Sequence, residues 1–176
     1  MAQEKRKKKF FDVDMPVIEK ETQLQAYESS ELDGRIITYD LTRLLKGKSM
    51  LLQLRVKNED GKMIASPIQA KLLPYFLRRM VRKGTNYVED SFSTPSKDGK
   101  MTVKPFLVTR RKVSRAIMKA LRDKAKEELI EYFKSKNSEM LFDEMIKGQM
   151  QKYLSLKLKK IYPLSLCEIR ILKVTK

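Results

Sequence analysis

The chain has 176 residues, of which 39 are lysine or arginine, 22 are aspartate or glutamate and none is histidine, so its formal net charge is +17. A polyanion, either a nucleic acid or an anionic membrane surface, is the partner that such an excess attracts. The missing histidines exclude Ser-His-Asp and Cys-His nucleophile activation and histidine-containing metal sites. The single cysteine, Cys167, excludes an internal disulfide, and we interpret it as a small buried hydrophobe and not a reactive thiol.

The length fits one domain, and 41% hydrophobic residues are enough for a core although 35% of the residues are charged. The sequence predicts neither a signal peptide nor an apolar stretch long enough to cross a membrane, so we expect a cytoplasmic protein. Glu4 to Lys9 is a charge run with no hydrophobic partner. It predicts a flexible basic arm over residues 1–9, ahead of a single domain over residues 10–176.

Strands dominate the first two thirds of the chain. Segments rich in β-branched, aromatic or alternating apolar residues predict strands over residues 10–18, 35–39, 51–57, 62–65, 87–94 and 101–109. Asp60-Gly61 and Asp98-Gly99 favour tight turns that join the last four segments into two hairpins. Between the second and third strands, Asp40 can cap a short helical turn that ends at Gly47.

Helices follow the strands. Pro74 in the first turn and Gly84 past the end predict a helix over residues 72–83. A second helix is predicted from Arg111 to about Lys136, but its apolar residues change face near Asp123, so it either bends there or packs its later half on a different neighbour.

The remaining segments predict a helix capped at Asn137-Ser138 and ending near Gly148, a further turn or two over residues 150–159, and a closing strand over residues 166–174. This order predicts an α+β fold with a mainly antiparallel, curved or barrel-like sheet and amphipathic helices packed on it.

The candidate site is a set of cations on the arm and on two amphipathic helices, whose other sides are apolar. Arginine forks suit phosphate oxygens and favour ordered contacts over diffuse attraction. A membrane is disfavoured because the apolar faces of the helices lack tryptophan and are needed for a core. A merely solvated surface is the other interpretation. The candidate RNA-binding residues are Lys5, Arg6, Lys7, Lys8, Lys9, Arg78, Arg79, Arg82, Lys83, Arg110, Arg111, Lys112, Arg115, Lys119 and Arg122. Base stacking would need exposed aromatics; Tyr75 and Tyr87 are candidates, although we prefer core packing for both.

An enzyme is not expected, because there is no phosphate loop, dinucleotide fingerprint or nucleophile elbow, and no cofactor or metal is expected either. Three alternatives stay open. The chain could be a free regulatory or tRNA-handling RNA-binding module, or a Mg²⁺-dependent nuclease that uses Asp12 with Asp14 or Glu89 with Asp90. Part of the surface could instead dock a protein through the acidic segments Glu127 to Glu131 and Asp143-Glu144.

The order of the segments resembles the small-subunit ribosomal protein family of archaea and eukaryotes called S-three-a-e, or eS-one. The resemblance runs from about Lys9 to Val174 and depends on the order and spacing of its pieces, since no single piece is a sharp motif. The pieces are Phe11-Asp12-Val13 with Pro16, Gly34-Arg35 before Asp40-Leu41, Tyr87-Val88 leading to Lys97-Asp98-Gly99, Phe106 to Arg111, and Lys160 to Leu164.

The resemblance implies a non-enzymatic protein with a β-rich, barrel-like body that binds ribosomal RNA. It also implies a place on the platform of the small subunit, near the 3′ end of the small-subunit RNA and the messenger exit path. Neighbouring platform proteins, and initiation factors in eukaryotes, are the protein partners it implies. The chain is shorter at both ends than eukaryotic members, so we expect an archaeal-type member.

Overall fold

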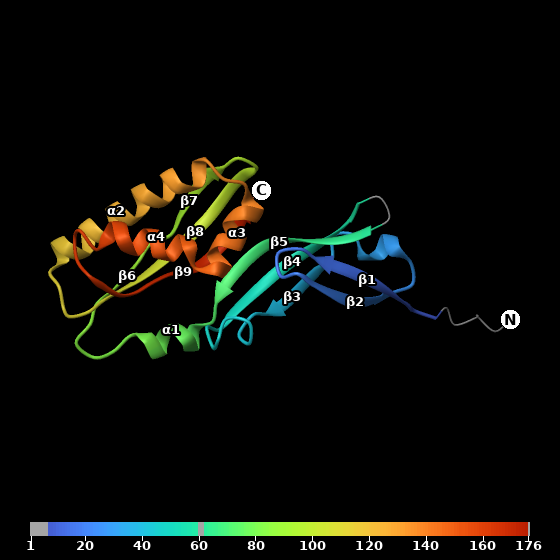
Figure 1. Cartoon of the computed structure of the whole chain (residues 1–176), viewed down its shortest axis with the longest axis horizontal. Helices are drawn as coiled ribbons and strands as arrows, with labels where there is room; N and C mark the ends of the chain where they lie inside the picture. The colour runs from blue at the N-terminus through green and yellow to red at the C-terminus, as the bar shows by residue number, and fades with distance from the viewer. Residues whose placement is uncertain (1–6, 60–61, 176) are drawn as a thin grey trace.

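The computed structural model describes residues 7–59 and 62–175, which form an elongated molecule with one sheet along its length (Figure 1). The candidate residues Lys5 and Arg6, and the turn Asp60-Gly61, lie outside the described residues. The strands are β1 (Lys9–Met15), β2 (Lys20–Ala26), β3 (Ile36–Asp40), β4 (Met50–Glu59), β5 (Lys62–Leu72), β6 (Tyr87–Glu89), β7 (Phe92–Ser96), β8 (Gly99–Thr109) and β9 (Leu164–Thr175). The helices are a 3₁₀ turn η1 (Ser29–Leu32), α1 (Pro74–Met80), α2 (Arg115–Lys134), α3 (Ser138–Lys147) and α4 (Gln149–Leu158).

Strand β5 joins the two halves of the sheet. Its first residues pair with β1, its last residues pair with β9, and β4 runs antiparallel along its whole length. Pairs β1–β2 and β3–β4 lie at the N-terminal end, whereas β6 and β7 both pair with the long strand β8 at the other. Because apolar side chains alternate along β4 and β5, one continuous core connects both halves.

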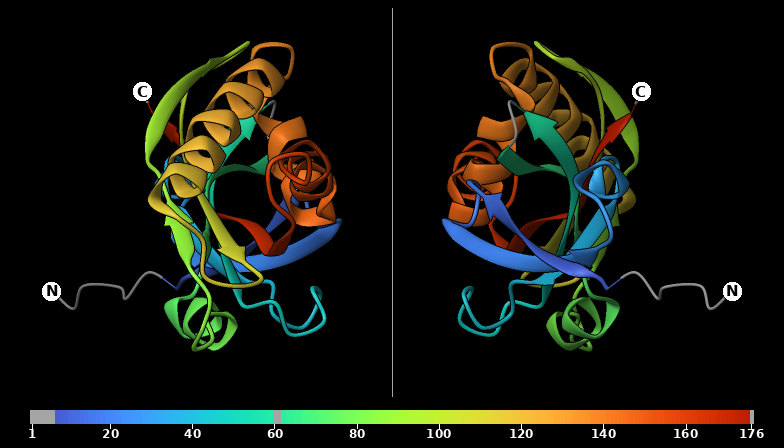
Figure 2. Two further views of the ribbon diagram at one scale, coloured as in Figure 1. Left: turned by 90° about the vertical axis from the view of Figure 1, so that its left-hand side faces the viewer. Right: turned by 90° about the vertical axis from the view of Figure 1, so that its right-hand side faces the viewer.

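Helices α2, α3 and α4 lie together over the C-terminal half of the sheet, while α1 lies apart from them (Figures 1 and 2). Leu121, Ala125, Leu129 and Phe133 repeat every four residues along α2, and all four are buried, where α2 packs on β7 and α4. Among the described residues, no helix combines the length and the apolar character that crossing a membrane requires.

The predicted α+β class and the mainly antiparallel sheet are confirmed, with β1–β5 as a parallel pair. The sheet curves strongly when viewed along the long axis (Figure 2), but it stays open and does not close into a barrel. Strand β2 was not predicted, because Lys20–Ala26 is polar and carries only one β-branched residue. Pairing with β1 over seven residues determines its structure, which a local pattern does not reveal.

Three predicted helix boundaries are wrong. Helix α1 begins at Pro74 and not at Leu72, which is the last residue of β5. Helix α1 ends at Met80 and not at Lys83, because Val81 adopts an extended backbone and its side chain packs against the core. Helix α2 begins at Arg115 and not at Arg111; Ser114 caps it by accepting a hydrogen bond from the Ile117 amide at 3.4 Å.

Of the two alternatives left open for α2, the structure shows no break at Asp123, since the helix is continuous from Arg115 to Lys134, and it shows contacts of α2 with both β7 and α4. Two alanines also contribute to the apparent change of face. Ala116 and Ala120, which belong to the first apolar set, are exposed, so the start of α2 is only lightly covered by the rest of the protein. Alanine is a good helix former whether or not it is buried. Counting these two alanines as apolar residues therefore gave a wrong prediction of which face of α2 packs against the protein.

Candidate nucleic-acid interface

Thirteen of the fifteen candidate cations lie in the described part of the chain, and all thirteen side chains are exposed. Within residues 7–59 and 62–175, none of the thirteen forms an ion pair with a carboxylate. The cations that do form ion pairs are others, such as Lys48 with Glu168 at 2.6 Å. The candidate set is therefore a surface whose positive charge is not neutralised by the described acids.

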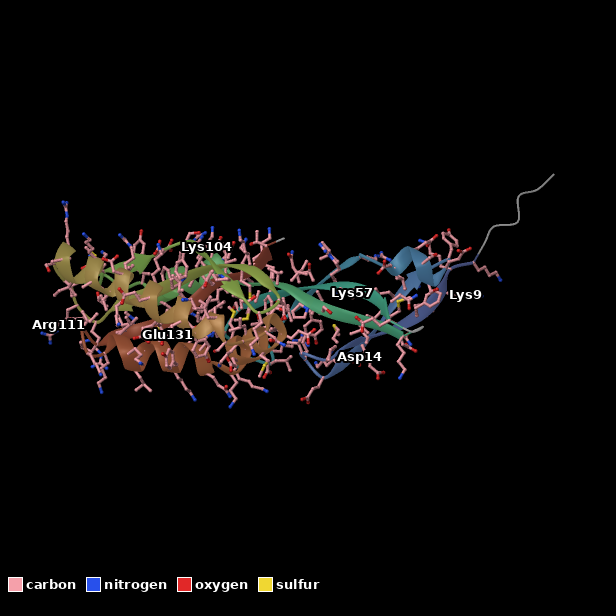
Figure 3. All side chains as sticks on the ribbon, turned by 90° about the horizontal axis from the view of Figure 1, so that it is seen from above. Lys9, Asp14, Lys57, Lys104, Arg111 and Glu131 are labelled. Atoms are coloured by element: carbon pink, nitrogen blue, oxygen red, sulfur yellow. The ribbon has the colours of Figure 1, made fainter. Side chains whose placement is uncertain are left out.

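The structure separates the candidates into two groups at opposite ends of the molecule. Lys9 lies near the N-terminal end and Arg111 lies at the far end (Figure 3). Lys9 is the first residue of β1, paired with Ala26, and so belongs to the sheet instead of the predicted arm. The Lys8 ammonium lies 5.6 Å from the centre of the Tyr27 ring, at a distance that permits a cation–π contact.

The larger group, which we call the basic end, lies on α1 and the residues after it, on the segment before α2 and on the first half of α2. Its members are Arg78, Arg79, Arg82, Lys83, Arg110, Arg111, Lys112, Arg115, Lys119 and Arg122. Helix α1 is amphipathic as predicted, because Phe76 and Leu77 are buried while Arg78 and Arg79 are exposed. The Arg79 guanidinium lies 5.7 Å from the centre of the Phe76 ring.

Asn86 joins the segment after α1 to the segment before α2. Its backbone amide and carbonyl bind Thr109 at the end of β8, and its side-chain oxygen accepts a hydrogen bond from the Val113 amide at 3.0 Å. The Thr109 hydroxyl also donates to the Arg111 carbonyl at 2.7 Å. The segments that carry Arg82 and Arg111 are thus held together, although these residues are far apart in the sequence.

A row of cations runs along the first half of α2. Arg111 precedes the helix, so Arg115, Lys119 and Arg122 are its helical members. Lys126, which continues the same row, lies with its ammonium 5.8 Å from the centre of the Phe92 ring on β7. Lys126 is itself exposed, so the row of exposed cations on α2 runs from Arg115 to Lys126.

The prediction that Tyr75 and Tyr87 pack in the core is wrong. Tyr75 is 54% exposed and Tyr87 is 56% exposed. The Tyr87 ring stacks on the buried ring of Phe106, with 5.8 Å between centroids and 22° between planes. Residues of the α1 segment line a cleft together with Tyr87, and this cleft leaves the Tyr87 ring accessible.

The carboxylates considered for a nuclease have other partners. Asp12 accepts a hydrogen bond from Gln23 at 2.9 Å, Glu89 pairs with Arg170 at 3.0 Å, and Asp90 accepts from the Ser91 amide at 2.8 Å. Among the described residues, no three metal-binding side chains of the His, Cys, Asp or Glu type converge. The geometry contributes nothing in favour of metal-assisted hydrolysis.

Several acids of the proposed protein-docking segments have structural roles. Glu128 is buried and accepts a hydrogen bond from the Tyr153 hydroxyl at 2.8 Å, so it joins α2 to α4. Glu144 binds both Lys136 and the Tyr132 hydroxyl, and Asp143 pairs with Lys147 within α3. These acids hold the helical layer together.

Fold and surface together define a basic α+β protein with an arginine-rich end built on a fixed scaffold. The sequence profile described as the Ribosomal S3Ae family matches residues 2–176, and the chain belongs to this family of ribosomal proteins. The predicted resemblance is thereby confirmed.

Similar proteins include three from archaea that carry the name small ribosomal subunit protein eS1. The Saccharolobus islandicus protein is 29% identical over 181 residues, covering 96% of this chain and 85% of the relative. The Nanoarchaeum equitans protein is 25% identical over 168 residues, covering 90% and 84%. The Methanothermobacter thermautotrophicus protein is 33% identical over 95 residues, which is 53% of this chain and 49% of that relative.

Proposed function

We propose that the protein is a structural constituent of the small ribosomal subunit, where it binds ribosomal RNA and serves translation. The observation that carries this proposal is the family match over nearly the whole chain. The names of the archaeal relatives support the small subunit in particular. The exposed cations of the basic end supply the chemistry that such a role needs.

The proposed mechanism is positioning and not catalysis. Arginine and lysine side chains neutralise phosphates and release counterions, and these contacts fix the register of the RNA without reading its sequence. Asn86 and Thr109 hold two of the basic segments in place before RNA arrives. A preformed surface loses less conformational entropy on binding than a mobile one, so it adds affinity.

The position within the small subunit is inferred from the resemblance to the family. We propose the platform of the small subunit, near the 3′ end of its RNA and the messenger exit path, in the cytoplasm. Neighbouring platform proteins are the protein partners, together with initiation factors. A footprint of the protein on small-subunit RNA tests this placement, since protection should fall on platform RNA and protection confined to another region would contradict it.

Sedimentation separates a ribosomal constituent from a free RNA-binding module. The tagged protein, expressed in an archaeal host, should sediment with the small subunit in a sucrose gradient at moderate salt. Washing at high salt should release it, because phosphate contacts weaken steeply with salt. Recovery of the protein only at the top of the gradient at moderate salt would contradict the proposal.

The salt dependence of RNA binding tests the basic end directly. Replacing Arg111, Arg115 and Arg122 together by glutamine should reduce the slope of log affinity against log salt by about two to three. A matched control replaces Lys20, Lys57 and Lys62, which are exposed cations of the other half of the molecule. The control removes the same charge and should change the slope by less than one, whereas equal slopes for the two variants would contradict this assignment.

A further inference from the structure

A cleft of about 550 Å³ lies between α1 and the sheet, beside the basic end. Leu77 and Val81 of the α1 segment form one wall, and Tyr87 and Phe106 form the facing surface on the sheet. Glu89 and Arg170 line the same cleft, and Arg78 lines it from α1. We propose that this cleft binds one unpaired guanine of RNA, stacked on Tyr87. The inference rests on the proposed RNA-binding function and specifies what one part of that surface recognises.

The size of the cleft suits one nucleotide, since pockets for small organic groups range from about 300 to 1,000 Å³. One wall is apolar and the other presents an aromatic face, which is the combination that unpaired bases use in single-stranded RNA recognition. Tyr87 is more than half exposed, so a base can reach its ring without displacing any core residue.

Tyr87 is held in place as a stacking platform. Phe106 is only 3% exposed and supports the Tyr87 ring from beneath in a stacked arrangement. Val108 pairs with Tyr87 across β6 and β8, which fixes the backbone. A platform that is ordered before binding loses little side-chain entropy when a base stacks on it. Tyr75, which is equally exposed on α1, does not line the cleft, and within the described part of the chain no aromatic ring stacks on it.

The ion pair between Glu89 and Arg170 supplies groups that read a base edge. The Arg170 Nη1 atom donates to Glu89 Oε2 at 3.0 Å, which orients both side chains and leaves further donors on the guanidinium and a second oxygen on the carboxylate. Guanine presents an acceptor, O6, followed by two adjacent donors on its Watson–Crick edge. Arginine donating to O6 and carboxylate oxygens accepting from both donors satisfy all three, whereas uracil offers a single donor between two acceptors.

Charge at the mouth of the cleft favours RNA over a protein segment as the occupant. Arg78 lines the cleft, and Arg79 and Arg82 lie in the same short stretch of chain with exposed side chains. The flanking phosphates of a bound nucleotide would therefore meet cations that have no carboxylate partner within the described residues. An apolar peptide would gain nothing from these charges.

The test uses the full chain and labelled seven-nucleotide RNAs, measured by fluorescence anisotropy at one fixed salt concentration. The RNAs are oligouridine with a central guanine, with uracil at that position, and with an abasic residue there. The wild type should bind the guanine RNA most tightly. Tyr87→Ala should weaken guanine binding roughly 5- to 100-fold, as loss of one base–aromatic stack does, and leave the abasic RNA unchanged. Tyr87→Phe should retain binding.

Two further variants complete the test. Tyr75→Ala removes an equally exposed tyrosine and should change no affinity. Glu89→Gln should abolish the preference for guanine over uracil, because an amide cannot accept from both donors. Equal loss for the abasic RNA, or no preference of the wild type for guanine, would overturn the inference. Absence of binding to any of these RNAs and to ribosomal RNA would instead contradict the proposed function, so the two failures are distinguishable.

Discussion

Asn86 and Thr109 bind each other through two hydrogen bonds: the Thr109 amide donates to the Asn86 carbonyl at 2.9 Å, and the Asn86 amide donates to the Thr109 hydroxyl oxygen at 3.0 Å. Thr109 is fully buried. The pair extends the pairing of β6 with β8 by one residue on each strand. It fixes the backbone where the chain enters β6 and where it leaves β8. Each departing segment carries cations of the basic end.

Asn86→Ala should both destabilise the protein and weaken RNA binding. The variant removes the acceptor of the Val113 amide, so the free energy of unfolding should fall by about 1–2 kcal/mol. RNA affinity should fall as well, because Arg110 to Lys112 lose their fixed backbone. Urea unfolding and anisotropy measure the two effects.

Asn58→Ala, at an exposed position on β4, is the control and should change stability by less than about 0.5 kcal/mol. An unchanged unfolding free energy for Asn86→Ala would contradict the role assigned to Asn86.

The two groups of cations should contribute to RNA binding independently. Replacing Lys7, Lys8 and Lys9 by glutamine, and separately Arg110, Arg111 and Lys112, should each lower the salt slope by about two to three on small-subunit RNA. Because the groups lie at opposite ends of the molecule (Figure 3), the combined variant should show the sum of both losses. Measurements between 50 and 300 mM salt give the slopes. A combined loss no larger than either single loss would show that only one end contacts RNA.

Local patterns predicted most elements because apolar alternation and turn residues act over short distances. The hairpin β4–β5 and the αL glycine Gly148 after α3 are examples. Long-range contacts explain what was missed. The Asp98 carboxylate, and not Asn137, accepts from the Ser138 amide at the start of α3, 40 residues further along the chain. Likewise, nothing near Glu89 in the sequence indicates Arg170, so the cleft that they line was not foreseen.

Cys167 should be inert in the folded protein. Burial raises the pKa of its thiol to about 12, with the nearby Glu168 charge adding to this and Lys48 opposing it. The reactive species is the thiolate, so at pH 8 alkylation by iodoacetamide should be slower by roughly a hundredfold or more than in guanidinium-unfolded protein. Mass spectrometry of both samples over time gives the rates. A native rate within tenfold of the unfolded rate would contradict this expectation and the sequence-based interpretation of Cys167.

Glu128 should make stability depend on pH below about 5. The hydrogen bond from Tyr153 lowers the pKa of this carboxyl most; burial opposes it, and Lys124 and Lys157 lower it further. Since the pKa is lower in the folded state than in the unfolded state, the stabilisation is complete above the usual glutamate pKa of about 4.5 and is lost as pH falls through the folded value.

Glu128→Gln tests this dependence. At pH 7 the variant should lose about 1–3 kcal/mol of unfolding free energy, because a buried, charge-assisted network loses its anion. The loss should shrink between pH 5 and pH 3, where the wild-type carboxyl also becomes neutral. Glu127→Gln is the matched control, since Glu127 binds the same Lys124 at 3.2 Å but is 68% exposed, and it should change stability by less than about 0.5 kcal/mol. Urea unfolding at pH 7, 5 and 3 measures the unfolding free energy of all three proteins. If the difference in unfolding free energy between wild type and Glu128→Gln stays constant with pH, protonation of Glu128 does not cause the pH dependence.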